Sequence, residues 1–537
     1  MSRRQSGRRK VFYLFHRSAG IASAFLGVIV FFTGALVVFG HDLDGWASRD
    51  RPAPSIADLP PGFIDRAVVT AQDALAAKYE GDFGTRDIRV GSAPGALTLS
   101  FSIPDDDKRA DYVDIDPATG AILRAERFTF SDRVKSEPRS SLERFFVQLH
   151  VRLLVDGKLG LLLTGVIAIL LLLLVGTGLY VHWPRRGNLV RPPRKSMRQW
   201  LGDMHTLIGA WSMPFTFILS VTGAFFSFAG AILIPVMIVV AFGGDQEQMM
   251  AIVKGDYGVS ESEAVAVVQP MIDDARQRAP GTSIGRLQLN EWGGKEAHVV
   301  VSVFVPGYAL SNRGLVYDGH NGSFLAEKAV LGAKPSVGGE VLRWIGPLHF
   351  GNLFGFATQL VWMLLGLLTC VLAGLGFGLW AIRNTERSPK GARVARALLG
   401  GCAGLPVAAG ATIAAWGFAQ GPRVWTAMTL AFFGSLVATM IGGALLPLGR
   451  CLRLLFGLGA AGLAIAPLIG FMVTGIGPFA ALKLPEASHT AYVDLGFLLS
   501  ALLLGLAAAR LPGFEESLEQ TTLAPGEPEL LDEPATT

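Results

Sequence analysis

Long apolar segments alternate with polar stretches along this chain, and the pattern predicts a mainly α-helical membrane protein. A helix needs about 20 apolar residues to cross the roughly 30 Å hydrocarbon core of a bilayer. Eight segments meet that length, so we expect eight transmembrane helices. They cover about 11–39, 159–183, 205–230 with an apolar continuation to 242, 356–382, 397–419, 424–446, 452–475 and 492–509.

Two polar regions with similar patterns separate the first four of these segments. Each has a helical period followed by strand-like alternation, and each ends in a hairpin-like sequence, DIDPATGAIL or LVYDGHNGSFL. Asp116-Pro117 favours a turn, and Gly120 supplies the positive φ that such a turn needs. We therefore expect two small α+β domains, inserted between helices 1 and 2 and between helices 3 and 4. Expected helices cover 64–79 and 261–277, and expected strands cover 97–103, 112–115, 284–289 and 297–305.

These patterns divide the chain into eight parts. The parts are the basic N-terminus with helix 1 (1–45), the first polar domain (46–145), helix 2 (146–186), a basic loop with helix 3 (187–243), the second polar domain (244–340), helix 4 with a basic loop (341–396), four C-terminal helices (397–510) and an acidic tail (511–537).

Composition and charge agree with this division. The chain is 51% hydrophobic and 17% charged, whereas soluble domains carry about 25% charged residues. Lysine and arginine gather before helix 1, between helices 2 and 3 and after helix 4. Such loops are cytoplasmic by the positive-inside rule, so both termini are expected inside and both polar domains outside. The N-terminal apolar run is too long for a cleaved signal peptide, which indicates a retained anchor.

A two-helix unit, in which a histidine leads each helix, occurs twice. When the segment 12–40 is laid on the segment that contains Trp200 without a gap, His16 matches His205 and Thr33-Gly34-Ala35 matches Thr222-Gly223-Ala224. A second pair recurs as His150 in QLHVRLL, before a helix that ends GTGLY, and His349 in PLHFGNL, before a helix that ends GFGLW.

Histidines on facing helices can hold a haem iron from both sides. The predicted topology places His16 with His205 at the cytoplasmic face and His150 with His349 at the outer face. Basic neighbours, Arg17 and Arg152, could pair with haem propionates.

Other roles for the histidines stay open. A histidine at a helix end is often an interfacial residue with no ligand role, although the repeated context favours ligation. His41 and His182 have no counterpart in the repeat and form a second tier of ligands, either of which could replace one of the four. His298 and His320 are expected to be solvated.

Other chemistry is sparse in the sequence. The cysteines Cys370, Cys402 and Cys451 have no metal or redox spacing, and the absence of C-x-x-C-H excludes covalent c-type haem. There is no G-x-G-x-x-G after a strand, no P-loop and no H-E-x-x-H. Any electron donor must therefore be a separate protein or a quinol.

The motifs together resemble the PepSY-associated transmembrane helix family, which includes iron-regulated membrane proteins and ferric-siderophore reductases of the FoxB type. The resemblance covers about residues 10–385 and rests on FHRSAG with TGAL, QLHVRL with GTGLYVHWP, DMHTLIGAW with TGAF, and PLHFGNLFG with GFGLW. It implies a bacterial inner-membrane protein with periplasmic PepSY domains, and it places the family's motif histidines on His16, His150, His205 and His349. The helices after Arg396 depart from the family's four-helix core.

We therefore expect an enzyme, a b-type haem oxidoreductase with two haems that reduces a periplasmic ferric siderophore or ferric chelate for iron uptake. Its other partners would be an electron-donor protein or quinol and the lipid bilayer, and no nucleic acid. Two alternatives stay open. One is a non-enzymatic PepSY membrane protein that binds or regulates a periplasmic partner, and the other is a siderophore or iron transporter.

Overall fold

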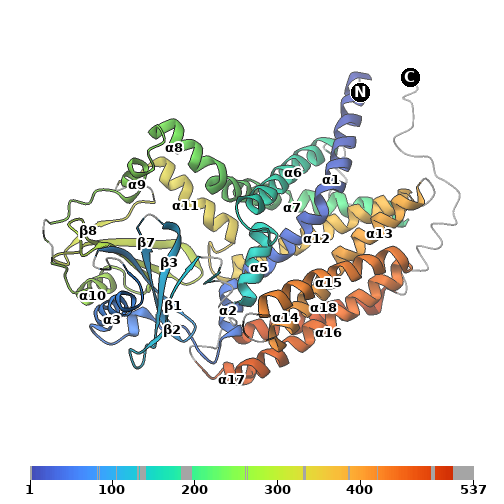
Figure 1. Ribbon diagram of the computed structural model, residues 1–537. Coiled ribbons are helices and arrows are strands. Elements are labelled where there is room, and N and C mark those ends of the chain that lie inside the picture. Colours follow the sequence, from blue (N-terminus) through green and yellow to red (C-terminus); the bar gives the residue numbers. More distant parts are fainter. Residues whose placement is uncertain are drawn as a thin grey trace.

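The protein has a long helical bundle with a single β-sheet at one end (Figure 1), and about 67% of it is helical. We call the two ends of the bundle the sheet end and the terminal end, because the N-terminus lies at the end opposite the sheet. This computed structural model describes residues 3–80, 83, 85–104, 106–129, 132–133, 141–182, 196–260, 262, 264–330, 334–384, 388–419, 421, 423–484 and 490–511.

Four long helices form the first part of the bundle and pack in the cyclic order α1, α6, α7, α12, so α1 lies diagonally opposite α7. Their bounds are α1 Arg3–Val37, α6 Lys158–His182, α7 Met197–Phe228 and α12 Phe356–Asn384. These are the four helices that the sequence repeat predicts.

The C-terminal helices form a second bundle that packs against α1 and α12. They are α13 Pro389–Ala403, α14 Leu405–Phe418, α15 Arg423–Leu445, α16 Leu448–Thr474, α17 Pro478–Ala481 and α18 Ala491–Arg510. The predicted span 397–419 is bent by 47° between α13 and α14. Gly404 lies at this bend, where a Cβ would be 2.3 Å from the hydroxyl oxygen of Thr439, and Pro406 begins the next helix.

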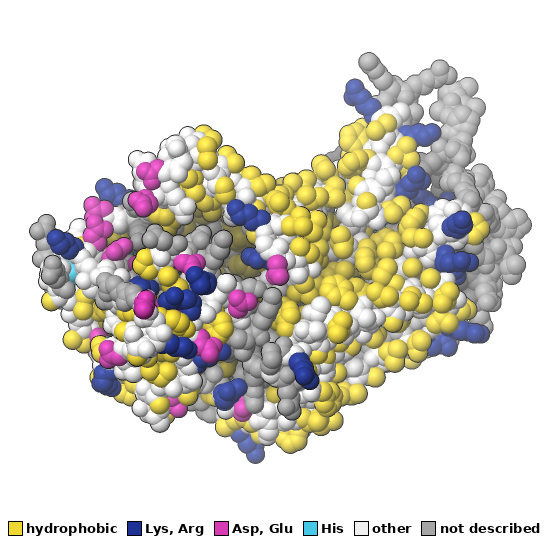
Figure 2. Space-filling model, viewed as in Figure 1, with side chains coloured by type: hydrophobic (Ala, Val, Ile, Leu, Met, Phe, Trp, Pro, Cys, Tyr) yellow, Lys and Arg dark blue, Asp and Glu magenta, His cyan; other side chains and the backbone are white. Residues whose placement is uncertain are grey.

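In the described part of the chain, seven helices are long and apolar enough to cross a membrane, and the bent pair would make an eighth. Figure 2 shows hydrophobic side chains over the bundle and charged side chains over the sheet domain and at the terminal end. The protein is therefore a multi-pass membrane protein. The apolar continuation of α7 begins with a π-helical turn, η3 (Ala229–Leu233), which is followed by α8 (Ile234–Phe242).

The two polar regions together form one antiparallel sheet of eight strands in the order β4-β3-β2-β1-β5-β6-β7-β8. The strands are β1 Arg86–Ala93, β2 Ala96–Ile103, β3 Asp106–Ile115, β4 Ile122–Thr129, β5 Ser283–Trp292, β6 His298–Val305, β7 Tyr308–Asp318 and β8 Phe324–Glu327. Helices α3 (Phe63–Lys78) and α10 (Gln269–Arg278) share a hydrophobic core with the sheet. Both hairpin turns are confirmed, with Gly120 at φ 74° and Gly322 at φ 77°.

The sequence pattern predicts two separate domains, whereas pairing of β1 with β5 joins them edge to edge. Strand β1, RDIRVGSA, was not predicted because charged residues interrupt its apolar alternation. Its Ile88 pairs with Leu289 and its Val90 with Leu287, and all four side chains enter the common core. The join removes two sheet edges that would otherwise be open to pairing with another chain.

Short helices connect the sheet to the bundle. They are α2 Gly40–Ala47, η1 Ile56–Asp58, α5 Ser141–Arg152, α9 Gln246–Lys254 and α11 Val337–Phe350. His150 and His349 precede transmembrane helices as predicted, but each lies on a short helix of its own, α5 or α11, which the apolar pattern does not predict. Leu153 and Leu154 (φ 53° and 58°) separate α5 from α6, and Gly351 (φ 72°) follows α11. These left-handed residues end each short helix and turn the chain into the next span.

Candidate functional site

Two pairs of histidines lie at opposite ends of the four-helix bundle. In the terminal pair, the ring centroids of His16 on α1 and His205 on α7 are 6.4 Å apart. In the sheet-end pair, the centroids of His150 on α5 and His349 on α11 are 6.1 Å apart. The structure thus brings together the two pairs that the repeat suggested.

Every one of these four rings has a hydrogen bond at Nδ1. His205 and His150 bond to the carbonyl oxygens of Leu372 (3.0 Å) and Val30 (2.8 Å). His16 bonds to the hydroxyl of Thr177 at 3.0 Å. His349 bonds to the hydroxyl of Thr222 at 2.9 Å.

These partners determine the tautomer of each imidazole. A carbonyl oxygen can only accept, so His205 and His150 must donate from Nδ1. Thr177 and Thr222 each donate their hydroxyl proton to a carbonyl of their own helix at 2.7 Å, so they too accept from the histidine. All four rings consequently carry a proton on Nδ1, so each ring in its neutral form has its free lone pair on Nε2, which is the arrangement of a metal-ligating histidine.

Glycines provide the space for the four rings. A Cβ on Gly34 would be 2.8 Å from Cε1 of His150, and a Cβ on Gly178 would be 3.1 Å from Cε1 of His16. The equivalent distances are 3.4 Å from Gly223 to His349 and 3.5 Å from Gly376 to His205. Gly34 and Gly223 belong to the repeated Thr-Gly-Ala motif, and Gly178 and Gly376 belong to the motifs GTGLY and GFGLW. Their contact with the histidines required the packing of helices that are distant along the chain.

Burial keeps the sheet-end imidazoles neutral. Helices α5 and α11 lie outside the membrane-spanning segments, and desolvation lowers the pKa of His150 below its ordinary value. Desolvation, with a smaller contribution from the neighbouring His150, lowers the pKa of His349 to about 3. A neutral ring is the form that can bind a metal.

The spacing of the rings fits one metal atom per pair. A metal–imidazole nitrogen bond is about 2 Å and each ring adds about 1 Å, so two rings on one atom have centroids about 6 Å apart. Among the described residues, no group of three or more His, Cys, Asp or Glu side chains could hold a metal ion. Two protein ligands alone suit a metal that brings its other ligands with it, as the iron of haem does.

The predicted arginines lie beside the histidines in sequence but on other faces of their helices. Arg17 is exposed on α1, and one residue of separation turns its side chain about 100° from His16. Arg152 is half-buried, and its Nε is buried without a hydrogen-bond partner in the described chain. Pairing of either residue with a propionate stays a prediction.

Arg383 lies in the last turn of α12. Its Nη1 donates to the hydroxyl of Tyr13, one turn before His16, while its Nε is buried without a partner among the described residues. Arg383 and Arg152 therefore each offer a buried N–H, the first near the terminal pair and the second near the sheet-end pair. An anionic group at either place would satisfy that donor.

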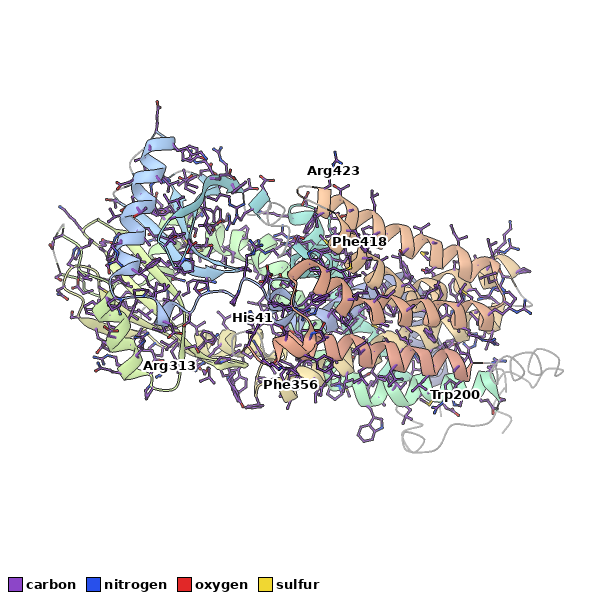
Figure 3. The ribbon with its side chains drawn as sticks, turned by 90° about the horizontal axis from the view of Figure 1, so that it is seen from below. His41, Trp200, Arg313, Phe356, Phe418 and Arg423 are labelled. Atoms are coloured by element: carbon purple, nitrogen blue, oxygen red, sulfur yellow. The ribbon has the colours of Figure 1, made fainter. Side chains whose placement is uncertain are left out.

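The remaining histidines lie elsewhere. Figure 3 places His41 beside Phe356, at the boundary of the bundle and the sheet domain, and Trp200 near the opposite end. His182 is close enough to His205 to act on it electrostatically. His489 lies outside the described residues.

The expectation that His298 and His320 are solvated is wrong for the first, which is 8% exposed. The ring of His298 bonds to the carbonyl oxygen of Glu296. Both ring nitrogens of His320 lie within hydrogen-bond distance of carbonyl oxygens, those of Ala264 and Lys295. Neither residue belongs to a histidine pair.

Comparison with known proteins finds a family match that spans both two-helix units of the repeat. The family model described as PepSY-associated TM region matches residues 13–383. The match contains all four paired histidines and both halves of the sheet, and it ends before the C-terminal bundle. An uncharacterised protein of Pseudomonas aeruginosa is 29% identical over 280 residues, which cover 49% of this chain and 69% of that protein.

Proposed function

Because this chain belongs to the family of PepSY-associated transmembrane regions, we propose that it is a membrane haem protein that carries electrons from one membrane face to the other. The supporting observation is the presence of two histidine pairs, one at each end of a single bundle, with rings 6.4 and 6.1 Å apart. His16 and His205 would hold one b-type haem and His150 and His349 a second, and bound haem supplies one-electron redox chemistry.

The distance between the pairs suits transfer across a bilayer. His16 and Val30, the partner of His150, both lie on α1 and are separated by 14 residues. At 1.5 Å per residue this is about 21 Å along the helix axis. The bundle therefore provides one site near each face of a hydrocarbon core of about 30 Å.

We propose the bacterial inner membrane as the location, with both termini in the cytoplasm and the sheet domain in the periplasm. The support is the charge at the terminal end of the described helices. Basic residues there are Arg383, Lys390, Arg393, Arg396, Arg450, Arg453 and Arg510. The terminal pair would then receive electrons from a quinol or from a cytoplasmic donor protein.

The proposed substrate is a ferric siderophore or another ferric chelate, whose Fe(III) would take up one electron at the sheet end and become Fe(II). Arg144 precedes His150 on α5, and Arg89 lies on β1. Burial raises the pKa of Tyr112 on β3, and the positive charges of Arg89 and Arg144 act in the opposite direction and lower it. Arg89 pairs with Ser100 of β2, and Ser100 pairs with Tyr112, so Arg89 and Tyr112 share one face of the sheet, on which Arg144 acts from α5. A basic surface at this place would attract an anionic chelate.

Visible absorption of the detergent-purified full chain, oxidised and then reduced with dithionite, tests the haem assignment. We expect a sharp reduced α-band and about two haems per chain. His349→Ala should remove about half of the haem, whereas His320→Ala, in a loop of the sheet domain, should remove none. A colourless protein expressed with ample haem would refute the proposal and favour the role of binding or regulating a periplasmic partner.

Rapid mixing of the reduced protein with a ferric chelate tests the substrate. We expect the reduced α-band to decay as Fe(II) appears in the presence of a ferrous-specific chromophore. If the band persists while two haems are bound, the ferric-chelate substrate is refuted. The electron-carrier function is then retained, with an acceptor of another class.

A further inference from the structure

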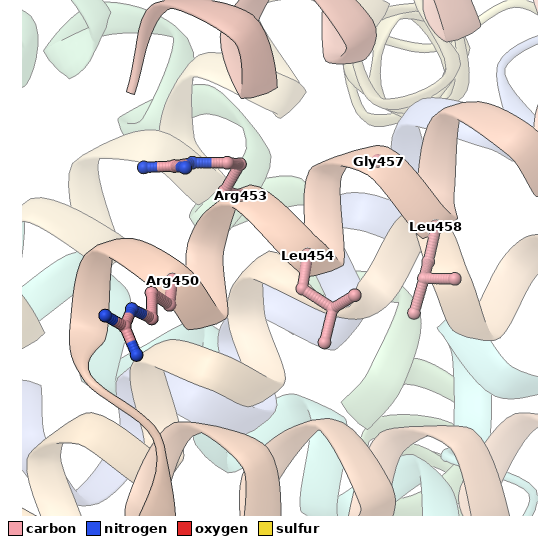
Figure 4. A pocket seen from close by; sticks show the side chains of 5 residues that line it. All are labelled: Arg450, Arg453, Leu454, Gly457 and Leu458. Carbon is pink, nitrogen blue, oxygen red and sulfur yellow. The ribbon is translucent and has the colours of Figure 1, made fainter. Parts of the chain in front are cut away.

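A hollow of about 370 Å³ opens on one face of α16, at the terminal end of the C-terminal bundle. It is lined by Arg450, Arg453, Leu454, Gly457 and Leu458 (Figure 4). Separations of three, four, seven and eight residues place these positions on one side of a helix. Neither histidine pair contributes to this site.

The lining changes from charged to apolar along the helix axis. Arg450 and Arg453 lie in the first two turns of α16, and Leu454 and Leu458 follow with 51% and 48% of their surface exposed. Gly457 lies between the leucines, where a Cβ would have no neighbour within 4 Å. The two arginines therefore form a charged end, and Leu454, Gly457 and Leu458 form an apolar groove about 6 Å long.

Further arginines lie at the same height along the bundle axis as Arg450 and Arg453. A Cβ on Gly459 of α16 would be 3.5 Å from Leu504 of α18. These two helices are antiparallel. Arg453 lies six residues before Gly459 and Arg510 lies six residues after Leu504, so the two arginines lie at the same height along the bundle. On the other side, Arg396 of α13 donates to the carbonyl of Ala444, at the end of α15.

Basic side chains outnumber acidic ones in the described C-terminal helices. Between positions 388 and 511, the one described acidic residue is Asp494. It lies far away at the sheet end, where it pairs with Arg49. The excess of arginine at this end of the C-terminal bundle therefore favours an anionic ligand.

We propose that this hollow binds an anionic phospholipid. The guanidinium groups of Arg450 and Arg453 would hold the phosphate, and an acyl chain would lie along Leu454, Gly457 and Leu458. Guanidinium groups bind phosphate oxygens through paired N–H donors, and basic pockets on the cytoplasmic side of membrane proteins bind lipid headgroups. A soluble anion would use the arginines but would gain nothing from the apolar groove.

Native mass spectrometry of the full chain, with mixed micelles of phosphatidylglycerol or phosphatidylcholine, tests this assignment. We expect wild type to retain phosphatidylglycerol in preference to phosphatidylcholine. The variant R450Q/R453Q should bind phosphatidylglycerol about 30-fold more weakly, at about a factor of five per arginine. R423Q provides the matched control, since Arg423 is an exposed arginine that Figure 3 places at the sheet end.

Two further variants distinguish binding of the lipid headgroup from binding of the acyl chain. G457L should fill the groove and weaken phosphatidylglycerol binding while leaving both arginines. R450K/R453K preserves the charge and should retain part of the binding, which also shows that the fold tolerates changes at these positions. Equal retention of both lipids by wild type, or full retention by R450Q/R453Q, would overturn the proposal.

Other ligands for the arginines would give different results. Displacement of phosphatidylglycerol by millimolar inorganic phosphate would indicate a free-anion site. Preferential binding that appears only after removal of residues 512–537 would indicate that the acidic tail occupies the arginines. Either result would replace the lipid assignment, and neither depends on whether the protein binds haem.

Discussion

Arg49 and Asp494, which are 445 residues apart in sequence, form a buried ion pair with 2.7 Å between Nη1 and Oδ2. The side chains are 0% and 1% exposed. The indole of Trp46 donates to the other carboxylate oxygen at 2.7 Å, and Nε of Arg49 donates to the hydroxyl of Thr474 at 3.2 Å. The segment that follows α1 is thereby fixed to α16 and α18.

This connection suggests a role for the C-terminal bundle. Phe145, on the same helix as His150, packs against Trp425 and Phe432 of α15 at centroid distances of 5.7 and 6.0 Å. The equivalent helix of the second unit, α11, leaves Val337 and Val341 85% and 59% exposed. The C-terminal bundle therefore supports α5, which carries one histidine of the sheet-end pair, and leaves α11, which carries the other, uncovered.

Asp494→Asn is expected to destabilise the protein by about 3–5 kcal/mol, because it leaves the Arg49 guanidinium buried without a counter-charge. Unfolding of the full chain in detergent, followed by tryptophan fluorescence, would measure this change. Asp273→Asn, in the exposed pair with Arg276, should cost at most about 1 kcal/mol. An apolar double replacement, Arg49→Met with Asp494→Leu, should recover most of the loss. Equal effects of the two single variants would contradict the assigned importance of the buried pair.

Thr222→Val is expected to weaken haem binding at the sheet-end pair by about 10- to 100-fold, because it removes the acceptor that orients His349. Haem retained after gel filtration and the reduced spectrum would report the loss. Thr216→Val is the matched control, since Thr216 is buried on the same helix and its hydroxyl donates to the carbonyl of Ser212. Thr222→Ser restores the hydroxyl and should restore binding. Unchanged haem in Thr222→Val would show that this hydrogen bond does not position the ligand.

Gly34→Ala is expected to displace His150 and to lower the haem content from about two per chain to about one. The added methyl group would lie 2.8 Å from Cε1 of the ring, well inside van der Waals contact. Gly27→Ala, on the same helix, places its methyl group 3.8 Å from Ile167 and should retain both haems. Pyridine haemochrome assay per chain distinguishes the two variants, and equal haem contents would argue against His150 as a ligand.

The sequence predicted the parts of the site whose signal is local or repeated. The four histidines were found because their helices recur with the same motifs, and the hairpins were found because Gly120 has a recognisable turn context. The Nδ1 partners were not found, since Leu372 and Val30 contribute only a backbone carbonyl, which any residue supplies. The pairing of β1 with β5 and of Arg49 with Asp494 was also missed. Those contacts are set by tertiary packing between segments that have no shared pattern.

Glu143 should make stability depend on pH. It lies on α5 against Gly40, and its pKa is raised from 4.5 to about 7, first by burial and then by the negative charge of Asp44, with Arg144 acting in the opposite direction. A carboxyl with a raised pKa stabilises the fold fully below its unfolded pKa and loses that contribution as the pH rises through the folded value. The wild type should therefore lose stability between about pH 4.5 and 7.

Glu143→Gln should remove this loss, because the amide stays neutral at every pH. The free energy of unfolding of the variant minus that of wild type should rise by about 3 kcal/mol between pH 4.5 and 8, and this difference should stay constant above pH 8. Glu143→Asp keeps a titrating carboxyl at the position and should keep the pH dependence. Thermal unfolding of the three proteins in detergent across this range measures the difference. Parallel profiles for wild type and Glu143→Gln would show that the carboxyl is already ionised at low pH and that α5 is open to water beside Asp44.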